Sequence, residues 1–307
     1  MVQKSETIWF DGKQVPWDEA NVHVLTHALH YGTAVFEGIR AYECADGSSE
    51  VFRLEEHMVR LVNSAKILGL DMPYSAQELS EAAVETLKLN KLAGAYVRPL
   101  VFVGEGAMGV HPGANPIKTI IACWPWGAYL GEDALEKGIK VKVSSFSRHH
   151  VNVMMTKAKS AGNYVNSVLA KTEAVADGYD EAIMLDTTGH VSEGSGENIF
   201  MVLNDIIYTP HTDGVLGGLT RDSIIALAGD LGYEVREEPI TRDMIYTADE
   251  VFFSGTAAEL TPISSVDRRI IGNGAAGPVA KLLQTEFFKI VKGENSDYEH
   301  WLYRYQA

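Results

Sequence analysis

Residues 182–209 read AIMLDTTGHVSEGSGENIFMVLNDIIYT, and this stretch indicates the fold class. Three apolar runs, 182–185, 198–203 and 206–209, are separated by segments rich in Gly, Asn, Asp and Thr. Short apolar runs bounded by such residues are typical of strands, and the segment through Thr187-Thr-Gly189 is a predicted hairpin turn. The stretch therefore predicts strands that are connected locally, not strands that each alternate with a helix.

Predicted helices and further strands surround this stretch on both sides. Upstream we expect a strand at Ile139–Ser145 and a helix at about 161–177. Downstream we expect a helix at about 220–231, a strand at Val251–Ser254 and a helix at about 278–292. The first third of the chain has the same mixture, with strands at Thr7–Phe10, Ala34–Tyr42, Glu50–Leu54 and Ala95–Val103, a helix at Glu55–Leu70 and a second helix that ends at Leu92. Hairpins mixed with helices predict an α+β (mixed α/β) protein rather than a doubly wound parallel sheet.

Two domains are expected. The chain has 307 residues, which is enough for two domains of ordinary size. The periodic pattern is lost around Trp124-Pro-Trp-Gly-Ala-Tyr-Leu-Gly131, and a new block begins at Ile139. We therefore expect a small N-terminal α/β domain at 1–123, an interdomain linker at 124–134 and a large C-terminal domain at 135–307.

Charge and composition exclude several classes of function. The chain carries 41 acidic and 26 basic residues, a formal charge of -15, which repels phosphate backbones and anionic membranes. Neither nucleic acid nor a membrane is therefore an expected partner, and the N-terminus lacks the apolar core of a signal peptide. Cys44 and Cys123 have no metal-binding or redox spacing. We expect a cytoplasmic protein without a metal site.

A glycine motif at residues 104–109, Gly-Glu-Gly-Ala-Met-Gly, matches the G-x-G-x-x-G fingerprint of dinucleotide-binding folds. That fingerprint requires a helix directly after it and an acidic residue about twenty positions later. The next residues are Val-His-Pro-Gly-Ala-Asn-Pro116, which do not start a helix easily, and the later position lies in Ile-Ile-Ala-Cys-Trp124. A nicotinamide site is therefore not expected, and these glycines are interpreted as a loop.

Two lysines lie in the segment Met155-Thr-Lys-Ala-Lys-Ser-Ala-Gly-Asn-Tyr164. A lysine whose pKa is lowered by burial can act as a nucleophile toward a carbonyl group. Lys157 and Lys159 share a face in an extended segment but point about 200° apart in a helix. The segment alone leaves open whether either lysine is a reagent or both are surface charges.

Three further features complete a pattern. A glutamate in Val191-Ser-Glu-Gly-Ser-Gly-Glu-Asn198 could hold a protonated ring nitrogen, although a structural turn explains it equally well. The segments Leu216-Gly-Gly-Leu-Thr-Arg-Asp222 and Phe253-Ser-Gly-Thr-Ala-Ala258 place backbone amides beside hydroxyl groups, as phosphate sites do. An amine, a carboxylate and two phosphate cradles together suit pyridoxal 5'-phosphate (PLP), whose aldehyde, ring nitrogen and phosphate need those partners.

An ordered set of motifs resembles a known family. The set comprises His30-Tyr-Gly-Thr-Ala-Val-Phe-Glu-Gly-Ile-Arg40, Arg53-Leu-x-x-His57-x-x-Arg60, Tyr96-Val-Arg-Pro-Leu100, Lys159-Ser-Ala-Gly-Asn-Tyr164, Ser192-Glu-Gly-Ser-Gly-Glu-Asn198 and Ser254-Gly-Thr-Ala-Ala258. It resembles the branched-chain amino acid aminotransferases, which are two-domain fold-type IV PLP enzymes with a D-amino acid aminotransferase-like fold. The resemblance extends from about residue 7 to about residue 290.

The resemblance implies a role for each candidate cofactor residue. It selects Lys159, in the predicted large domain, as the lysine that forms the Schiff base with PLP and moves the substrate proton. It further implies that Glu193 holds the pyridinium nitrogen, that Tyr164 hydrogen-bonds the ring hydroxyl and that Leu216 packs against the ring. The implied phosphate ligands are Arg60, the Leu219 N–H, Thr220 and Thr256.

The resemblance also implies the reaction and the substrate pocket. L-leucine, L-isoleucine or L-valine would give its amino group to the cofactor, and 2-oxoglutarate would then collect it as L-glutamate in a ping-pong mechanism. The implied pocket wall is Phe36, Trp126, Tyr129 and Tyr164; Arg98 receives the γ-carboxylate of 2-oxoglutarate; Tyr96 and the N–H groups of Thr256 and Ala257 take the α-carboxylate. Tyr31 and Val110 would come from a second subunit, so a homodimer is the expected smallest active unit.

Several rivals stay open. A D-amino acid aminotransferase has an arginine followed two residues later by histidine, whereas Arg98 is followed by Pro99 and Leu100. An (R)-amine transaminase or a 4-amino-4-deoxychorismate lyase fits the Tyr-x-Arg arrangement poorly, and a non-catalytic PLP-binding protein would lack Lys159 or Glu193. Relatives often have proline where Met155 and Gly217 stand, so we expect cofactor affinity, more than reaction type, to differ.

Overall fold

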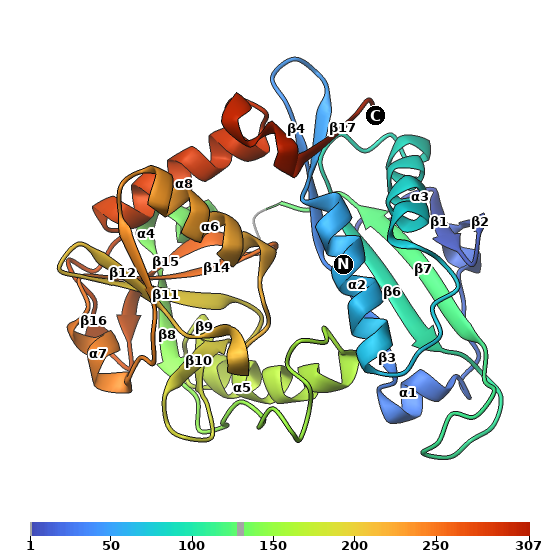
Figure 1. Ribbon diagram of the computed structural model, residues 1–307, viewed down its shortest axis with the longest axis horizontal. Coiled ribbons are helices and arrows are strands. Elements are labelled where there is room, and N and C mark those ends of the chain that lie inside the picture. Colours follow the sequence, from blue (N-terminus) through green and yellow to red (C-terminus); the bar gives the residue numbers. More distant parts are fainter. Residues whose placement is uncertain (1, 128–131) are drawn as a thin grey trace. The chain divides into compact units, whose positions relative to one another are not determined.

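The computed structural model describes residues 2–127 and 132–307, which form two compact units (Figure 1). The first unit comprises Met1–Trp126, Ala158–Gly162 and Lys289–Ala307, and the second comprises Gly127–Lys157 and Asn163–Phe288. The domains expected from the sequence were continuous, whereas these units are not. The difference arises because Ser160 forms a β-bridge with Val35, and because the last strand of the chain pairs with a strand near residue 50. Part of the predicted linker lies outside the described residues, so the boundaries 1–123, 124–134 and 135–307 stay a prediction.

The first unit contains an eight-stranded antiparallel sheet. Its order is β17-β5-β4-β6-β7-β1-β2, and β3 pairs with β6 beside this path. The strands are β1 (Thr7–Phe10), β2 (Lys13–Pro16), β3 (Ala34–Phe36), β4 (Ile39–Glu43), β5 (Ser49–Phe52), β6 (Ala95–Val103), β7 (Ile117–Trp124) and β17 (Leu302–Tyr305). The predicted strands at Thr7–Phe10 and Ala95–Val103 are confirmed at both ends, and the predicted strand Ala34–Tyr42 is divided at Glu37-Gly38.

Helices α2 and α3 cover this sheet and supply its core (Figure 1). The helical parts of the first unit are η1 (Trp17–Glu19), α1 (His27–Tyr31), α2 (Leu54–Ile67), α3 (Ala76–Leu89) and η4 (Ser296–Trp301). In α2 Met58, Leu61 and Ala65 are buried, and burial of a side chain such as Leu61 stabilises the fold by about 1.5–3 kcal/mol. Helix α3 begins with a capping box, because Ser75 Oγ accepts the Glu78 N–H and the Glu78 carboxylate accepts the Ser75 N–H.

The second unit contains a nine-stranded mixed sheet. Its order is β10-β9-β8-β15-β14-β11-β12-β13, and β16 pairs with β15 beside this path. The strands are β8 (Ile139–Val143), β9 (Glu181–Leu185), β10 (Val191–Gly194), β11 (Asn198–Leu203), β12 (Ile206–Thr209), β13 (Glu234–Glu237), β14 (Glu250–Gly255), β15 (Glu259–Val266) and β16 (Arg269–Ile270). Neighbouring strands are antiparallel except β8 with β9, β8 with β15 and β12 with β13. The predicted strands 198–203 and 206–209 are confirmed, and Asn204 and Asp205 form their turn with φ of 53° and 61°.

The helices of the second unit lie around this sheet (Figure 1). They are α4 (Glu132–Lys137), η2 (Ala161–Asn163, which begins in the first unit), α5 (Tyr164–Ala176), η3 (Thr212–Gly214), α6 (Leu219–Asp230), α7 (Arg242–Thr247) and α8 (Pro278–Val291, which ends in the first unit). Helices and strands occur throughout the chain, so the predicted α+β class is confirmed. Within the described ranges, no helix is long and apolar enough to cross a membrane.

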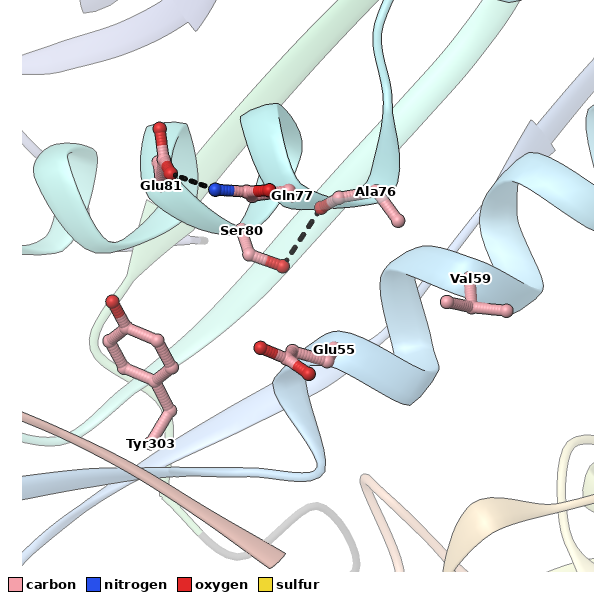
Figure 2. A pocket seen from close by; sticks show the side chains of 7 residues that line it. All are labelled: Glu55, Val59, Ala76, Gln77, Ser80, Glu81 and Tyr303. Atoms are coloured by element: carbon pink, nitrogen blue, oxygen red, sulfur yellow. Dashed lines mark hydrogen bonds between the residues drawn. The ribbon is translucent and has the colours of Figure 1, made fainter.

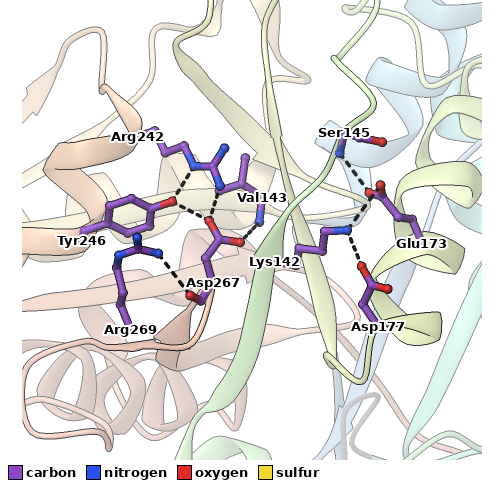
Figure 3. A network of polar contacts seen from close by, with 9 residues as sticks. All are labelled: Lys142, Val143, Ser145, Glu173, Asp177, Arg242, Tyr246, Asp267 and Arg269. Carbon is purple, nitrogen blue, oxygen red and sulfur yellow. Dashed lines mark hydrogen bonds and ion pairs between the residues drawn. The ribbon is translucent and has the colours of Figure 1, made fainter.

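Polar contacts connect β8 to its neighbours on two sides (Figure 3). On one side Lys142 Nζ lies 3.3 Å from the Glu173 carboxylate and 2.5 Å from that of Asp177, both on or next to α5. The hydrogen bond from Ser145 contributes most to a lowered pKa of Glu173, which is about 2. On the other side the Asp267 carboxylate accepts the Val143 N–H at 3.0 Å and pairs with Arg242 of α7 at 2.6 Å. These contacts fix β8 in the sheet and so fix the start of the loop that follows it.

Candidate active site

The lysine segment of the first unit is attached to β3 and α2. The Phe36 N–H donates to the Lys159 carbonyl at 3.0 Å, and Ser160 pairs with Val35. The Lys159 N–H in turn donates to the buried Ser64 Oγ of α2 at 3.1 Å. The side chain of Lys159 is half-buried, with Nζ 5.2 Å from the centre of the Phe36 ring. Backbone contacts on both sides therefore fix where this amine can reach.

Lys157 has different surroundings. It belongs to the second unit, is exposed, and donates from Nζ to the Thr212 carbonyl. Partial burial of Nζ lowers the pKa of Lys157, although Asp213 acts in the opposite direction. A lowered lysine pKa therefore does not by itself identify the reactive lysine here. What separates the two lysines is that only Lys159 lies on the segment bonded to β3.

Arg60 is held by a buried carboxylate. Glu37 is fully buried; Arg60 Nε lies 2.6 Å from its Oε1 and Arg60 Nη2 lies 2.8 Å from its Oε2. His57 Nδ1 lies 2.7 Å from the same Oε2. Burial would raise the pKa of Glu37, but the charges and hydrogen bonds of Arg60 and His57 outweigh it and hold that pKa well below its usual range. Glu37 therefore stays anionic and orients the Arg60 guanidinium.

Sequence reasoning did not single out Glu37. A signal for it exists in the sequence: Glu37 lies between two strands, Ala34–Phe36 and Ile39–Glu43, that are joined by only two residues, which is too short a connection to expose it. His57 and Arg60 also stand three residues apart on one helix, so both side chains reach the same side.

Aromatic rings and Arg98 gather beside β6 in the first unit. Tyr96 and Arg98 are two residues apart on β6 and therefore point to the same face of the sheet. The Tyr96 ring lies 4.3 Å from that of Trp126, and Arg98 Nη2 donates to the Tyr96 hydroxyl at 3.1 Å. The Arg98 guanidinium lies 4.7 Å from the centre of the Phe36 ring. Four of the predicted pocket residues are thus brought together, and Tyr129 lies outside the described residues.

Tyr31 and Val110 are exposed, at 42% and 85% respectively. His27 lies between their segments, since its ring centre is 4.5 Å from that of Tyr31 and its Nε2 is 2.7 Å from the Gly109 carbonyl oxygen. Residues 104–116 form a loop, as their sequence predicts.

Glu193 lies in the second unit at the end of β10, where it is 5% exposed. Arg148 Nε lies 2.7 Å from Glu193 Oε1, and the Leu216 N–H donates to Oε2 at 3.3 Å. Asn198 Nδ2 reaches the same Oε2 at 3.4 Å and the Leu216 carbonyl at 3.0 Å. The structure therefore brings Glu193 and Leu216 together around an ion pair with Arg148. The sequence contains no local signal for that pair, because Arg148 comes from a loop remote from Glu193.

The predicted phosphate-binding amides lie at the start of α6 and after β14. Gly218 is the N-cap of α6, and a Cβ atom there would come within 2.0 Å of Asn198 Oδ1, so the backbone approach requires glycine. Leu219 and the buried Thr220 follow as the first residues of the helix, whose N-terminus favours anions. Thr256 and Ala257 are half-buried in the turn between β14 and β15, and Tyr164 is the half-buried first residue of α5.

A surface hollow of about 390 Å³ lies between α2, α3 and β17 (Figure 2). It is lined by Glu55, Val59, Ala76, Gln77, Ser80, Glu81 and Tyr303. None of these is a predicted site residue, and its two carboxylates oppose the binding of a phosphate. The hollow is therefore not the candidate active site.

Several known proteins are similar to this chain in sequence and fold. Residues 34–266 match the family described as amino-transferase class IV. A branched-chain-amino-acid aminotransferase of Pseudomonas aeruginosa is 50% identical over 301 residues, which cover 98% of each chain. The crystal structure of an Escherichia coli branched-chain amino acid aminotransferase has a TM-score of 0.95 and 50% identity, covering 97% of this chain and 99% of that one. The PLP form of a branched-chain amino acid aminotransferase from Thermobaculum terrenum has a TM-score of 0.92 and 34% identity, covering 98% of each chain.

The chain belongs to the class IV aminotransferases. The match extends over nearly the whole length of this chain and of its relatives, so the resemblance inferred from the ordered motifs and the expected fold-type IV architecture are both confirmed.

Proposed function

We propose that this protein is a PLP-dependent branched-chain amino acid aminotransferase. It transfers the amino group of L-leucine, L-isoleucine or L-valine to 2-oxoglutarate by a ping-pong mechanism, giving branched-chain 2-oxo acids and L-glutamate. The observation that carries the proposal is the grouping of Lys159, Phe36, Tyr96 and Arg98, which combines an amine, an apolar wall and a carboxylate receptor. The names of the full-length relatives give the same activity.

The described residues fit PLP. Lys159 supplies the amine, the buried Glu193 supplies an anion for the ring nitrogen, and Gly218 gives close access to the amides of α6. When bound, the cofactor supplies an electrophilic aldehyde and an electron-withdrawing ring. We assign the ring nitrogen to Glu193, the ring hydroxyl to Tyr164 and the ring face to Leu216. The phosphate is assigned to Arg60, the Leu219 N–H, Thr220 and Thr256.

Lys159 Nζ acts as general base and general acid by taking the proton from the substrate Cα and delivering it to the former aldehyde carbon, C4′. The attachment of its backbone to β3 and α2 limits the positions that the amine can take, which favours a geometry close to the one the reaction needs.

The same pocket has to accept an apolar side chain and the γ-carboxylate of 2-oxoglutarate. The rings of Phe36, Trp126 and Tyr129 are assigned to the apolar side chain, and Arg98 is assigned to the γ-carboxylate. Among the described residues Arg98 Nε is buried without a hydrogen-bond partner, which supports a role for this guanidinium in binding an anion. Tyr96 and the N–H groups of Thr256 and Ala257 are assigned to the α-carboxylate.

A homodimer is the proposed smallest active unit, in which each subunit contributes Tyr31 and Val110 to its partner. Exposed apolar side chains near these residues support the proposal, because Val24 is 73% and Leu29 is 64% exposed. The cytoplasm is the proposed location; the two cysteines are buried and free, as a reducing compartment allows.

Reduction of the cofactor adduct tests the proposal. We expect the protein reconstituted with PLP to be yellow, and borohydride to fix the cofactor on Lys159 in peptide mapping. Lys159→Ala should lose the adduct, whereas Lys157→Ala, two residues away, should keep it. An adduct on Lys157, or none at all, would refute the assignment.

Amino donors distinguish the reaction from its rivals. We expect L-leucine to convert the absorption spectrum of the bound cofactor from that of the aldehyde form to that of the amine form. D-alanine and (R)-1-phenylethylamine should react far more slowly. A preference for either of the last two would place the protein with the D-amino acid or (R)-amine transaminases instead.

A further inference from the structure

We propose that Arg148 is a positioning residue that keeps Glu193 charged and oriented toward the ring nitrogen of PLP. The proposal rests on the proposed function, because it requires that Glu193 bind that nitrogen. Arg148 itself touches neither substrate nor cofactor in this assignment; it acts through the carboxylate.

Arg148 and Glu193 form an ion pair away from solvent. Arg148 is 7% and Glu193 is 5% exposed, and Nε of the arginine lies 2.7 Å from Oε1 of the glutamate. Burial disfavours the charged form of an isolated carboxylate. A protonated Glu193 would have no negative charge to offer a pyridinium nitrogen. The charge of Arg148 therefore determines whether Glu193 can bind the pyridinium nitrogen as an anion.

The guanidinium is fixed at both ends. The Arg148 N–H donates to the Leu185 carbonyl at 2.7 Å, which ties its backbone to the end of β9. Arg148 Nη1 donates to Ser167 Oγ of α5 at 3.3 Å. Since the backbone and the far end of the side chain are both held, the guanidinium charge is kept beside Glu193, with Nε 2.7 Å from Oε1.

The two carboxylate oxygens of Glu193 have different neighbours. Oε1 faces Arg148, whereas Oε2 accepts from the Leu216 N–H at 3.3 Å and lies 3.4 Å from Asn198 Nδ2. This division sets the plane of the carboxylate. Leu216, the residue assigned to the face of the ring, is connected to the same group, so a rotated carboxylate would also disturb the ring contact.

Cofactor binding by the cofactor-free full-length protein provides the test, with PLP and 1-deazapyridoxal phosphate as the two probes. The second probe has carbon in place of the ring nitrogen and cannot bond to Glu193 through it. We expect Arg148→Met to raise the dissociation constant of PLP by about 10- to 100-fold, as loss of the opposite charge beside a buried carboxylate does, and that of the deaza compound by less than about threefold. Arg148→Lys, which keeps the charge but loses the planar fork, should lie between the two.

Glu193→Gln separates this inference from the proposed function. If Arg148 acts through Glu193, Arg148→Met should cost little PLP affinity in the Glu193→Gln background. Equal weakening of both probes by Arg148→Met, or a full additional loss in the double variant, would show a merely structural role and overturn the inference. Should Glu193→Gln itself leave PLP binding unchanged, the assignment of Glu193 would fail first. Thermal melting of each cofactor-free variant verifies that it is folded.

Discussion

Three buried glutamates show how single residues decide the chemistry of this acidic chain. Glu37 is paired with Arg60 and His57, and Glu193 is paired with Arg148. Glu197 differs from both, because its burial, and after that the charge of Glu181, raises its pKa to about 8. Its carboxyl group accepts the Gly196 N–H at 3.0 Å. Glu37 is therefore held as an anion, Glu193 lies beside a cation, and Glu197 is held mainly as a neutral acid at neutral pH.

The raised pKa of Glu197 predicts a pH-dependent stability. Its folded pKa of about 8 lies above its ordinary value of 4.5, so the folded state keeps a proton that the unfolded state releases between these values. The contribution of Glu197 to stability is therefore complete below about pH 4.5 and is lost as the pH rises through about 8. We expect Glu197→Gln to be relatively more stable than the wild type at pH 9 than at pH 5, as measured by urea unfolding.

Glu43→Gln, at the exposed end of β4, is the control for the loss of one carboxyl group. If both variants show the same difference between pH 5 and pH 9, the prediction for Glu197 is wrong.

Arg98 carries a prediction about substrate choice. If its guanidinium binds the γ-carboxylate of 2-oxoglutarate, Arg98→Ala should lower kcat/KM for that substrate by about 10- to 100-fold. The effect on 4-methyl-2-oxopentanoate should be much smaller, because an apolar side chain does not need the cation. Some loss on both is expected, since Arg98 also hydrogen-bonds Tyr96. Equal losses for the two oxo acids in steady-state assays would rule out the assigned role.

At the scale of elements, the sequence predicts those helices and strands that depend on interactions between residues close in the chain. The capping box of α3, the stripe of α2 and the strands β6, β11 and β12 follow from residues close in sequence. The parallel pairing of β8 with β9 and β15 does not, because partners far apart in the chain are chosen by packing. For the same reason the motifs located Lys159, while the ion pair between Arg148 and Glu193 required the structure.

The connection between β3 and β4 predicts a further functional effect. A Cβ atom at Gly38 would lie 2.0 Å from the Tyr96 hydroxyl oxygen. The Tyr96 ring cannot move away freely, since it packs against Trp124 at 5.1 Å and Trp126 at 4.3 Å. We expect Gly38→Ala to displace this ring and to raise KM for every amino and oxo acid, because all of them carry the α-carboxylate assigned to Tyr96.

Gly229→Ala is the matched control for that change. It adds the same methyl group within α6, where nothing lies within 4 Å, and should stabilise the helix by about 0.5–1 kcal/mol without changing KM. Unchanged KM values for Gly38→Ala would show that Tyr96 does not bind the α-carboxylate of the substrates.

At the scale of the whole molecule, the proposed dimer predicts that active sites are shared. Phe36 and Lys159 lie 5.2 Å apart, ring centre to Nζ, within one unit of one chain and therefore belong to the same site. Tyr31 is 42% exposed and is assigned to the site of the partner. A mixture of Lys159→Ala and Tyr31→Ala subunits would then contain dimers in which one site has both its own lysine and the partner's native tyrosine. Two variants that are each impaired alone should together recover activity.

The expected recovery can be stated as a number. Random pairing makes half of the dimers mixed, and each mixed dimer has one complete site of two, so activity should approach about a quarter of the wild-type value. Lys159→Ala mixed with Phe36→Ala is the control, because Phe36 and Lys159 serve the same site and no mixed dimer restores both. The subunits are unfolded and refolded together, and leucine-dependent turnover is compared with each variant refolded alone. Recovery in both mixtures would mean that Phe36 and Tyr31 both serve the site of the partner, which would contradict the assignment of Phe36. Recovery in neither would mean that Tyr31 serves the site of its own subunit.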